Sequence, residues 1–373
     1  MITTFPNVWQ EKLQHLAFKE LTPIKLQHLA FKELTPIQKE MFTPILNKEN
    51  VLGISPTGTG KTLAYLLPSL LNIKSQKSQQ LLILAPNTEL AGQIFEVTKE
   101  WAEPINLTAQ LLISGISQKR QIERLKKGPQ IIIGTPGRVY ELIQHKKVKM
   151  MSVDTIILDE YDELLSDSQI QFVQKISHHV PRDHQMIYMS ATNKVPVQSL
   201  EKNTKVIDLS DQDLSAIEHF YLSVDKRDKV NLLRKFSNLP DFRALVFFNS
   251  LSDLGASEEK LQFNGASAVS LASDISVPFR KTILEKFKQH DIKLLLATDL
   301  VARGIDIDNL EYVINFEVAR DKENYIHRAG RTGRMGKSGR VITLVSHPED
   351  IKKLKKFASV SELTLKHQEF QIK

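Results

Sequence analysis

The sequence of 373 residues contains no cysteine, which excludes disulfide bonds and thiolate zinc sites. Its eleven histidines are scattered, and we interpret the one adjacent pair, His178 and His179, as surface or helix-end residues. No apolar run approaches the length that spans a bilayer. The first residues also lack a basic segment followed by an apolar core, so we expect no signal peptide and a cytoplasmic location.

The composition is that of a folded globular chain, with 41% hydrophobic and 25% charged residues. The length exceeds that of one ordinary hydrophobic core, so two domains are expected. The formal net charge of +7 suits a polyanionic partner, although a merely basic enzyme would carry the same charge.

The most informative segment reads SPTGTGKT, between the apolar run Val51–Ile54 and a second apolar run, Leu63–Leu67. This order predicts a strand, a tight loop and a helix, with loop N–H groups and the helix N-terminus directed at a phosphate chain. Lys61 can reach the outer phosphates and the Thr62 hydroxyl can ligate Mg²⁺. We therefore predict a nucleoside triphosphate site, with a flexible surface loop as the weaker alternative. The residues expected to line it are Ser55, Thr57, Gly58, Thr59, Gly60, Lys61 and Thr62.

Buried strands and helices alternate through both halves, which predicts parallel α/β sheets covered on both faces. Strands in the first half are expected at Val51–Ile54, Leu81–Ala85, Thr108–Ile113, Gln130–Gly134, Thr155–Leu158 and Gln185–Met189, with helices that include Lys39–Leu46, Leu90–Trp101 and Gln169–His179. Strands in the second half are expected at His219–Val224, Ala244–Phe248, Ala268–Leu271, Leu294–Ala297, Tyr312–Asn315 and Val341–Val345, with helices at Lys226–Phe236, Leu254–Phe263, Phe279–Gln289 and Glu349–Phe357. Only the first half has a phosphate loop, so one nucleotide site in a cleft between two similar layers is suggested.

A polar, acidic stretch beginning at Asp208 is predicted to be an inter-domain linker. We assign residues 1–50 to an N-terminal segment, 51–207 to the first domain, 208–217 to the linker and 218–373 to the second domain.

The N-terminal segment contains thirteen residues, KLQHLAFKELTPI, twice in tandem, at Lys12–Ile24 and Lys25–Ile37. Two such units are too few for a solenoid, so we interpret the repeat as a recent local duplication or a cloning event. The second copy continues into the predicted helix and is expected in the native position, and the first is expected to add a helical turn or a surface loop.

The predicted strand Thr155–Leu158 leads directly into two carboxylates, Asp159 and Glu160. In a phosphate-loop protein this position lies at the carboxyl edge of the sheet, beside the nucleotide. Asp159 would hold Mg²⁺, partly through water, and Glu160 would orient or deprotonate the attacking water. Taken alone, the pair is better explained as a strand end exposed to solvent, because Asp-Glu pairs are common, so the choice depends on the wider pattern of motifs.

Further short motifs occur in a fixed order: LTPIQ at 34–38, TPGR at 135–138, DEYD at 159–162, SAT at 190–192, ATD at 297–299, ARGID at 302–306 and HRAGRTGR at 327–334. This ordered set resembles the DEAD-box RNA helicase family over essentially the whole chain. The resemblance implies two tandem RecA-like, doubly wound parallel-sheet domains with a nucleotide and RNA cleft between them. It also implies ATP and Mg²⁺ as cofactors, and RNA-stimulated ATP hydrolysis coupled to local, non-processive unwinding of RNA or remodelling of RNA–protein particles.

The resemblance assigns roles to residues around the nucleotide. Gln38 would read the adenine edge, Phe31 would pack near the base, and Asp306 would touch the ribose. Arg331 and Arg334 would be arginine fingers from the second domain, a contribution of roughly 10³–10⁵ in rate, with a basic surface face as the alternative. The residues implied to couple the nucleotide site to the domain interface are Asp162, Ser190, Thr192 and His327.

RNA contacts implied by the resemblance are backbone contacts made near Gly115, Thr135, Arg138, Arg280 and Thr298. Such contacts carry little sequence specificity and predict a steep salt dependence of binding. ATP and RNA should tighten each other's binding, since both favour a closed form. We expect a monomer that acts on ribosomal precursor particles, with mRNA remodelling as the runner-up.

The sequence departs from the family pattern at several positions, mostly on the RNA side. Tyr161 replaces an alanine, Thr88 an arginine and Val277 a glutamine, Ala272 and Ser273 replace His-Gly, and Ala319 replaces a proline. The nucleotide-site residues are intact, so these changes bear on the strength of unwinding and not on ATP binding.

Two other functions stay open: an ATP-gated RNA clamp with weak hydrolysis, and a DNA helicase of the same architecture. Intact Glu160, Arg331 and Arg334 argue against the clamp, and Gln38 with the SAT motif favours RNA over DNA. The basic run Lys352–Lys356 is interpreted as a solvated helix face.

Overall fold

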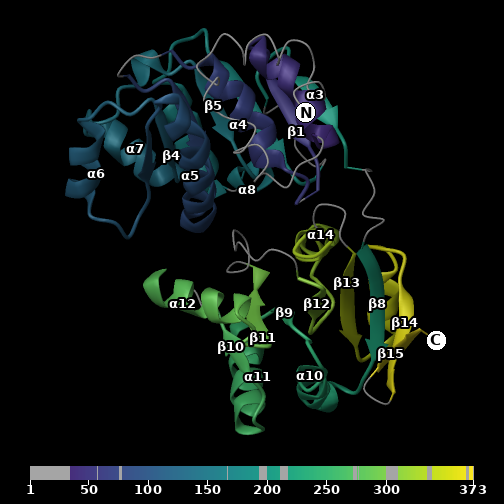
Figure 1. Cartoon of the computed structure of the whole chain (residues 1–373). Coiled ribbons are helices and arrows are strands. Elements are labelled where there is room, and N and C mark those ends of the chain that lie inside the picture. Colours follow the sequence, from purple (N-terminus) through teal and green to yellow (C-terminus); the bar gives the residue numbers. More distant parts are fainter. Residues whose placement is uncertain are drawn as a thin grey trace. The chain divides into compact units, whose positions relative to one another are not determined.

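The computed structural model describes residues 34–56, 58–74, 78–165, 167–192, 200–210, 217–271, 275, 277–299, 310–333, 338–366 and 369–372. The chain divides into two compact units between Gln212 and Asp213 (Figure 1). Each unit is built on a mainly parallel sheet with helices on its faces. None of the helices within these ranges is long and apolar enough to cross a membrane.

The first unit has a seven-stranded, wholly parallel sheet in the order β3-β4-β2-β5-β6-β1-β7. Its strands are β1 (Val51–Ile54), β2 (Leu81–Leu84), β3 (Ala109–Leu112), β4 (Ile131–Gly134), β5 (Thr155–Leu158), β6 (Gln185–Ser190) and β7 (Lys205–Asp208). The sequence predicted the first six. It missed β7, an edge strand in which only Ile207 is buried, so no apolar pattern marks it. Asp208, assigned to the linker, is therefore the last residue of this strand.

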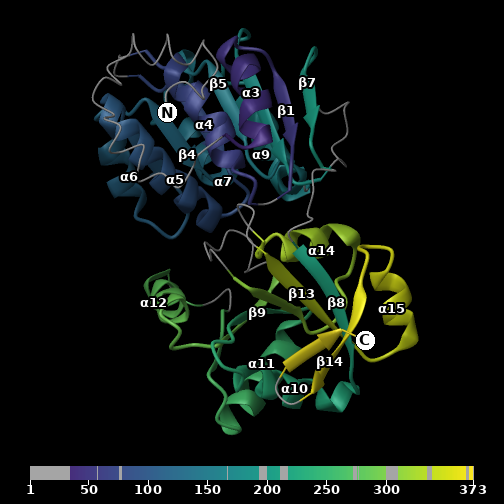
Figure 2. The ribbon, with the colours of Figure 1, turned by 45° about the vertical axis from the view of Figure 1, so that its right-hand side comes forward.

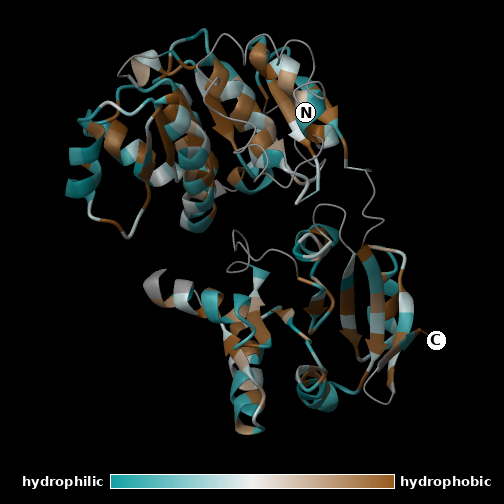
Figure 3. Ribbon diagram, viewed as in Figure 1, coloured by the Kyte–Doolittle hydropathy of each residue, from teal (hydrophilic) through white to brown (hydrophobic). Residues whose placement is uncertain are grey.

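Two apolar layers enclose this sheet, because alternate strand residues face opposite sides. Leu52 and Ile54 of β1 belong to one layer and Val51 belongs to the other. The first layer is completed by α6 (Gln118–Leu125), α7 (Pro136–Gln144), α8 (Tyr161–Leu164) and α9 (Asp167–Ser177), and the second by α3 (Pro36–Leu46), α4 (Lys61–Asn72) and α5 (Thr88–Ala102). Burial on both faces explains why β1, β2, β4 and β5 read as continuous apolar runs. Figure 3 shows hydrophobic ribbon concentrated in these strands.

Helix α3 starts at Pro36, three residues before the predicted start of this helix. Proline is favoured in the first turn, since its missing N–H has no partner there in any case. The described chain begins at Leu34, so Lys12–Ile24, the first copy of the duplicated segment, and most of the second copy lie outside the described residues.

The second unit has an eight-stranded sheet in the order β10-β11-β9-β12-β13-β8-β14-β15. Its strands are β8 (Ile217–Ser223), β9 (Ala244–Phe248), β10 (Ala268–Ser270), β11 (Leu294–Thr298), β12 (Tyr312–Asn315), β13 (Gly339–Val345), β14 (Ser361–Lys366) and β15 (Glu369–Ile372), and its helices are α10 (Lys229–Ser237), α11 (Leu251–Phe263), α12 (Val277–Lys288), α14 (Lys322–Ala329) and α15 (Pro348–Leu354). Helices α10 and α11 pack on one face, and α12, α14 and α15 pack on the other.

The C-terminal strands β14 and β15 were not predicted from the sequence. They form an antiparallel hairpin, and β14 adds to the edge of the sheet beside β8 (Figure 2). The tail after α15 thus extends the sheet of the second unit, and only Lys352, Lys353 and the turn that follows match the expected basic helix face.

A glycine in β4 gives a test of the packing in the first unit. A Cβ on Gly134 would lie 2.3 Å from the Leu112 carbonyl oxygen and 2.8 Å from Val139 Cγ2. We expect Gly134→Ala to lower the free energy of unfolding by about 1–3 kcal/mol, because the backbone has to move. Trp101 lies on α5 of the first unit and residues 213–373 contain no tryptophan, so urea unfolding followed by tryptophan fluorescence reports on the first unit.

The matched control is Gly92→Ala on helix α5, where an added Cβ meets nothing within 4 Å. Alanine is the better helix former, so this change should stabilise the unit by about 0.5–1 kcal/mol. Equal effects of the two substitutions would contradict the packing argument.

Candidate active site

The phosphate loop leaves the carboxyl edge of the first sheet at the end of β1 and enters α4 at Lys61. Gly58 and Gly60 have φ angles of 83° and 87°, a left-handed conformation that glycine adopts without strain. The loop is curled on itself: Lys61 Nζ donates to the Ser55 carbonyl oxygen (3.0 Å), and Ser55 Oγ donates to Thr59 Oγ1 (2.8 Å). The structure therefore brings together the predicted loop residues except Thr57, which lies outside the described residues.

Gln38 connects helix α3 to this loop. Its Oε1 accepts a hydrogen bond from Thr35 N (3.1 Å), and its Nε2 donates to the Gly60 carbonyl oxygen (3.1 Å). The side chain is buried. An amide has two hydrogens and several lone pairs, so both bonds are compatible with a further bond to an adenine edge. Phe31, predicted to pack near the base, lies outside the described residues.

The acidic pair follows β5 directly and is buried. The Tyr65 hydroxyl donates to Asp159 Oδ2 (2.9 Å) and Glu160 N donates to Asp159 Oδ1 (2.9 Å). Burial raises the pKa of Asp159 to about 6; the charge of Lys61 opposes this rise and that of Glu160 adds to it. Among the described residues, Glu160 Oε2 is buried without a hydrogen-bond partner. The acidic pair is thus desolvated, and it lies near Lys61 of the phosphate loop.

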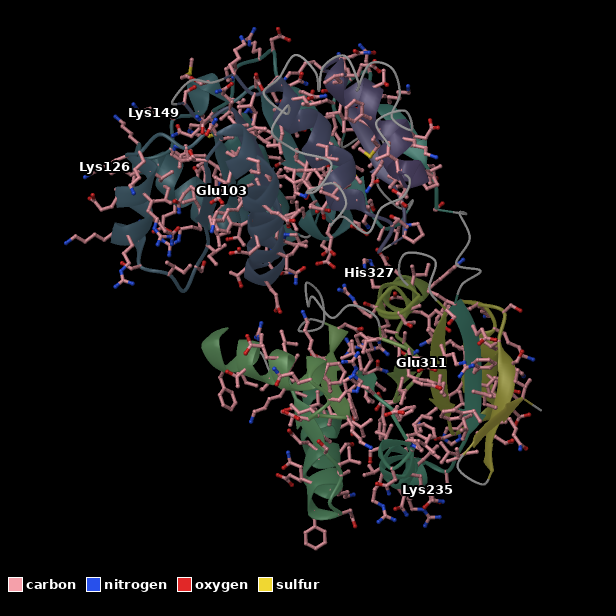
Figure 4. All side chains as sticks on the ribbon, viewed as in Figure 1. Glu103, Lys126, Lys149, Lys235, Glu311 and His327 are labelled. Carbon is pink, nitrogen blue, oxygen red and sulfur yellow. The ribbon has the colours of Figure 1, made fainter. Side chains whose placement is uncertain are left out.

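A line of hydrogen bonds joins the phosphate loop to the residues predicted to couple it to the rest of the protein. Ser55 N donates to the Ser190 carbonyl oxygen (3.1 Å) at the end of β6. Ser190 Oγ donates to the Thr192 carbonyl oxygen (2.7 Å), and Thr192 Oγ1 donates to Asp162 Oδ2 (3.3 Å). The structure therefore brings Asp162, Ser190 and Thr192 together. The fourth predicted coupling residue, His327, belongs to α14 of the second unit (Figure 4).

Three residues predicted to contact RNA lie after neighbouring strands of the first unit. Gly115 follows β3, and Thr135 and Arg138 stand at the start of α7, directly after β4. Glu141 joins the two segments, because it accepts from Gln118 Nε2 (2.8 Å) and from Arg138 Nη1 (2.9 Å). The N-terminus of α7 presents backbone N–H groups of the kind that bind phosphate.

The second unit contains a buried arginine to which the sequence analysis gave no role. The side chain of Arg328 is 1% exposed and forms a two-pronged ion pair with Asp299, at 2.6 Å from Nε and 2.7 Å from Nη2. Arg328 also donates to Asn249 Oδ1 (2.7 Å), Asn315 Oδ1 (3.2 Å) and the Glu317 carbonyl oxygen (3.4 Å). All five guanidinium N–H groups thus have acceptors.

Two of the predicted functional positions of the second unit lie close to this network in the chain. Thr298, a predicted RNA contact, precedes Asp299 at the end of β11, and Arg331, a predicted finger, follows Arg328 by three residues. Arg280, also predicted to contact RNA, lies in the second turn of α12. Asp306 and Arg334 lie outside the described residues.

The departures from the family pattern are accommodated in different ways. Tyr161 is buried, and its ring packs against that of Tyr188 with centroids 4.8 Å apart. Thr88 starts α5 on the surface, and Ala319 is fully buried in the core of the second unit. Val277 is the first residue of α12, and Ala272 and Ser273 lie outside the described residues.

A phosphate loop with an acidic pair on a nearby parallel strand defines the class of phosphate-loop nucleoside triphosphatases. Comparison with known proteins narrows this class. Residues 35–200 match the family model of the DEAD/DEAH box helicases, and residues 225–336 match the model of the helicase conserved C-terminal domain. The chain therefore belongs to the DEAD/DEAH box helicase family, and its two units are tandem RecA-like domains, which confirms the predicted fold class.

Individual relatives agree with this placement. The chain is 43% identical over 356 residues to the probable ATP-dependent RNA helicase YfmL of Bacillus subtilis, covering 94% of this chain and 91% of the relative. It is 39% identical over 375 residues to the DEAD-box ATP-dependent RNA helicase CshC of Bacillus cereus, covering 99% and 93%. Among solved structures, S. cerevisiae Dbp5 bound to RNA and ADP BeF3 matches with a TM-score of 0.81, 26% identity and coverage of 90% and 91%.

The Arg328 network gives a prediction about the stability of the second unit. We expect Asp299→Ala to lower its free energy of unfolding by about 3–5 kcal/mol, because the change leaves a buried guanidinium charge without its counterion. The second unit has no tryptophan. Its unfolding is therefore identified as the transition that appears in far-UV circular dichroism but not in tryptophan fluorescence.

Glu218→Ala is the control in the same unit. It removes an exposed ion pair with Arg340 (3.2 Å) and should cost less than about 1 kcal/mol. A comparable loss in both variants would show that burial of the Arg328 pair has no special consequence.

The raised pKa of Asp159 predicts the pH dependence of stability in protein free of nucleotide and metal. The folded carboxyl holds its proton up to about pH 6 and the unfolded one releases it near 3.8, so stability falls as the pH rises through this window and is constant above it. This rise in pKa lowers the free energy of unfolding of the wild type by about 3 kcal/mol between acidic pH and pH values above the window. An asparagine at position 159 avoids this loss, but it gives up about 1 kcal/mol because its single side-chain oxygen cannot accept the bonds from both Tyr65 and Glu160 N. Asp159→Asn should therefore stabilise the first unit by about 2 kcal/mol at pH 8, measured by urea unfolding.

The same advantage should disappear near pH 4, where the wild-type carboxyl is already protonated. Asp154→Asn, which neutralises an exposed carboxylate paired with Lys48, should change stability by less than about 1 kcal/mol. A stabilisation by Asp159→Asn of the same size at both pH values would contradict the assigned cause.

Proposed function

We propose that this protein is an ATP-dependent RNA helicase that couples ATP hydrolysis to local, non-processive unwinding of RNA duplexes or remodelling of RNA–protein particles. The observation that supports this most is the bonded path from Gln38 through the phosphate loop to Ser190 and Asp162. Such a path links a base-reading residue, a phosphate cradle and the predicted coupling residues in one domain.

The residues present fit ATP with a divalent cation. Lys61 already points back into the loop, where a phosphate oxygen would replace the Ser55 carbonyl as its partner. Asp159 is a buried carboxylate with a raised pKa and Glu160 has a buried oxygen without a partner, two features that a nearby cation and its water would relieve. We assign Thr62 and Asp159 to Mg²⁺, which would neutralise charge on the phosphate oxygens.

Glu160 then acts as the general base. It accepts a proton from the attacking water as the oxygen bonds to the γ-phosphorus and the bond to the β-phosphate oxygen breaks. Arg331 and Arg334 would stabilise the charge that spreads over the γ-phosphate oxygens. This assignment requires both RecA-like domains for rapid turnover, which couples hydrolysis to the state of the RNA.

RNA would be bound through its backbone, by Gly115, Thr135 and Arg138 of the first domain and by Arg280 and Thr298 of the second. We propose that the protein acts as a cytoplasmic monomer, and that ribosomal precursor particles are its substrate class. Backbone contacts would give weak sequence preference and a steep salt dependence.

ATPase rates measured with RNA, with DNA of equal length and without nucleic acid test this function. A helicase of this kind should show strong stimulation by RNA and little by DNA. Preference for DNA would favour a DNA helicase, and ATP-dependent RNA binding without stimulated turnover would favour a clamp.

Glu160→Gln isolates the base. We expect a loss of turnover of about 10²–10⁴-fold with retention of ATP-dependent RNA trapping, because the amide keeps the shape and removes the proton acceptor. Glu163→Gln, on the next turn, is the matched control and should keep most of the activity. Persistent turnover in Glu160→Gln would show that another group takes the proton.

A further inference from the structure

Tyr65 is a fully buried residue of α4 that the sequence analysis left without a role. Its hydroxyl donates to Asp159 Oδ2 (2.9 Å). The phenolic hydroxyl therefore holds one of the two side chains assigned to Mg²⁺.

The geometry of helix α4 places Tyr65 beside Thr62, the other side chain assigned to Mg²⁺. Thr62 and Tyr65 are three residues apart on α4, so they share a face of the helix. Asp159 comes from the end of β5, and its other oxygen accepts from Glu160 N (2.9 Å). Each carboxylate oxygen thus has one protein donor and keeps lone pairs for a further ligand.

Packing alone does not require the hydroxyl at this position. A phenylalanine would fill the same apolar space among the α3 and α4 side chains of the core. A buried tyrosine hydroxyl needs a partner, and here that partner is Asp159 of the candidate metal site.

We propose that Tyr65 is a positioning residue for the metal–nucleotide complex: its hydroxyl fixes the Asp159 carboxylate against helix α4, which carries Thr62, so that nucleotide binds tightly with Mg²⁺. The proposal rests on the proposed function, since it takes Thr62 and Asp159 as the metal-binding pair. Groups that orient metal-binding side chains typically change metal affinity or activity by about 10- to 100-fold.

Equilibrium binding of a fluorescent ADP, measured in EDTA and in saturating Mg²⁺, tests this role without measuring turnover. Tyr65→Phe should leave the affinity in EDTA within about twofold of wild type and reduce the Mg²⁺-dependent gain in affinity by about 10-fold. Tyr188→Phe is the matched control: it removes another buried tyrosine hydroxyl of the same unit, one that accepts from Glu201 N (3.1 Å), and should alter neither affinity.

A double-mutant cycle tests whether Tyr65 acts through its partner. In an Asp159→Asn background, Tyr65→Phe should have little further effect on the Mg²⁺-dependent gain. Equal weakening by Tyr65→Phe in EDTA and in Mg²⁺ would show a general structural role, and an unchanged gain would show no role; either result overturns the proposal. Absence of any Mg²⁺-dependent gain in the wild type would instead overturn the proposed nucleotide chemistry as well.

Discussion

The active-site geometry of the first domain depends on one backbone hydrogen bond, from Ser55 N to the Ser190 carbonyl oxygen. It continues the β1–β6 ladder past the last paired residues, Ile54 and Ser190, and so fixes the point at which the phosphate loop leaves the sheet. Because β5 is the other neighbour of β6, the same edge also receives Asp159. The three strands therefore deliver phosphate-binding, acidic and coupling residues to one place as a consequence of strand order alone.

The two acidic residues at this edge of the sheet are in energetically unfavourable environments when no ligand is bound. Asp159 is desolvated, and Glu160 adopts a left-handed backbone conformation with φ 48°, which is strained for a residue with a side chain. Both features are stabilised by the surrounding parallel sheet, whose strands are buried on both faces. A site that binds a cation and a polyanion can release such stored free energy on binding.

Local sequence patterns predicted the core strands and the phosphate loop, because each of these depends on neighbouring residues in the chain. Continuous apolar runs such as Ile131–Gly134 marked the core strands, and glycines followed by Lys61 marked the phosphate loop. Strand β7 was not predicted from the sequence, because an edge strand with one buried residue has no apolar periodicity.

The hydrogen bond between Gln38 and Gly60 joins residues 22 positions apart, and that between Tyr65 and Asp159 joins residues 94 apart. No periodicity records such a pairing. The sequence thus predicts candidate residues for the site, but the contacts between them follow from the tertiary fold and not from any local pattern. The Arg328 network of the second domain shows the same rule. Its acceptors Asn249, Asp299 and Asn315 stand at the ends of β9, β11 and β12, and β9 lies between the other two strands in the sheet although it precedes both in the chain. A planar guanidinium donates to all of these acceptors and to the Glu317 carbonyl oxygen through five N–H groups, whereas a lysine ammonium has three donors on one atom and would leave at least two of the five acceptor atoms without a bond.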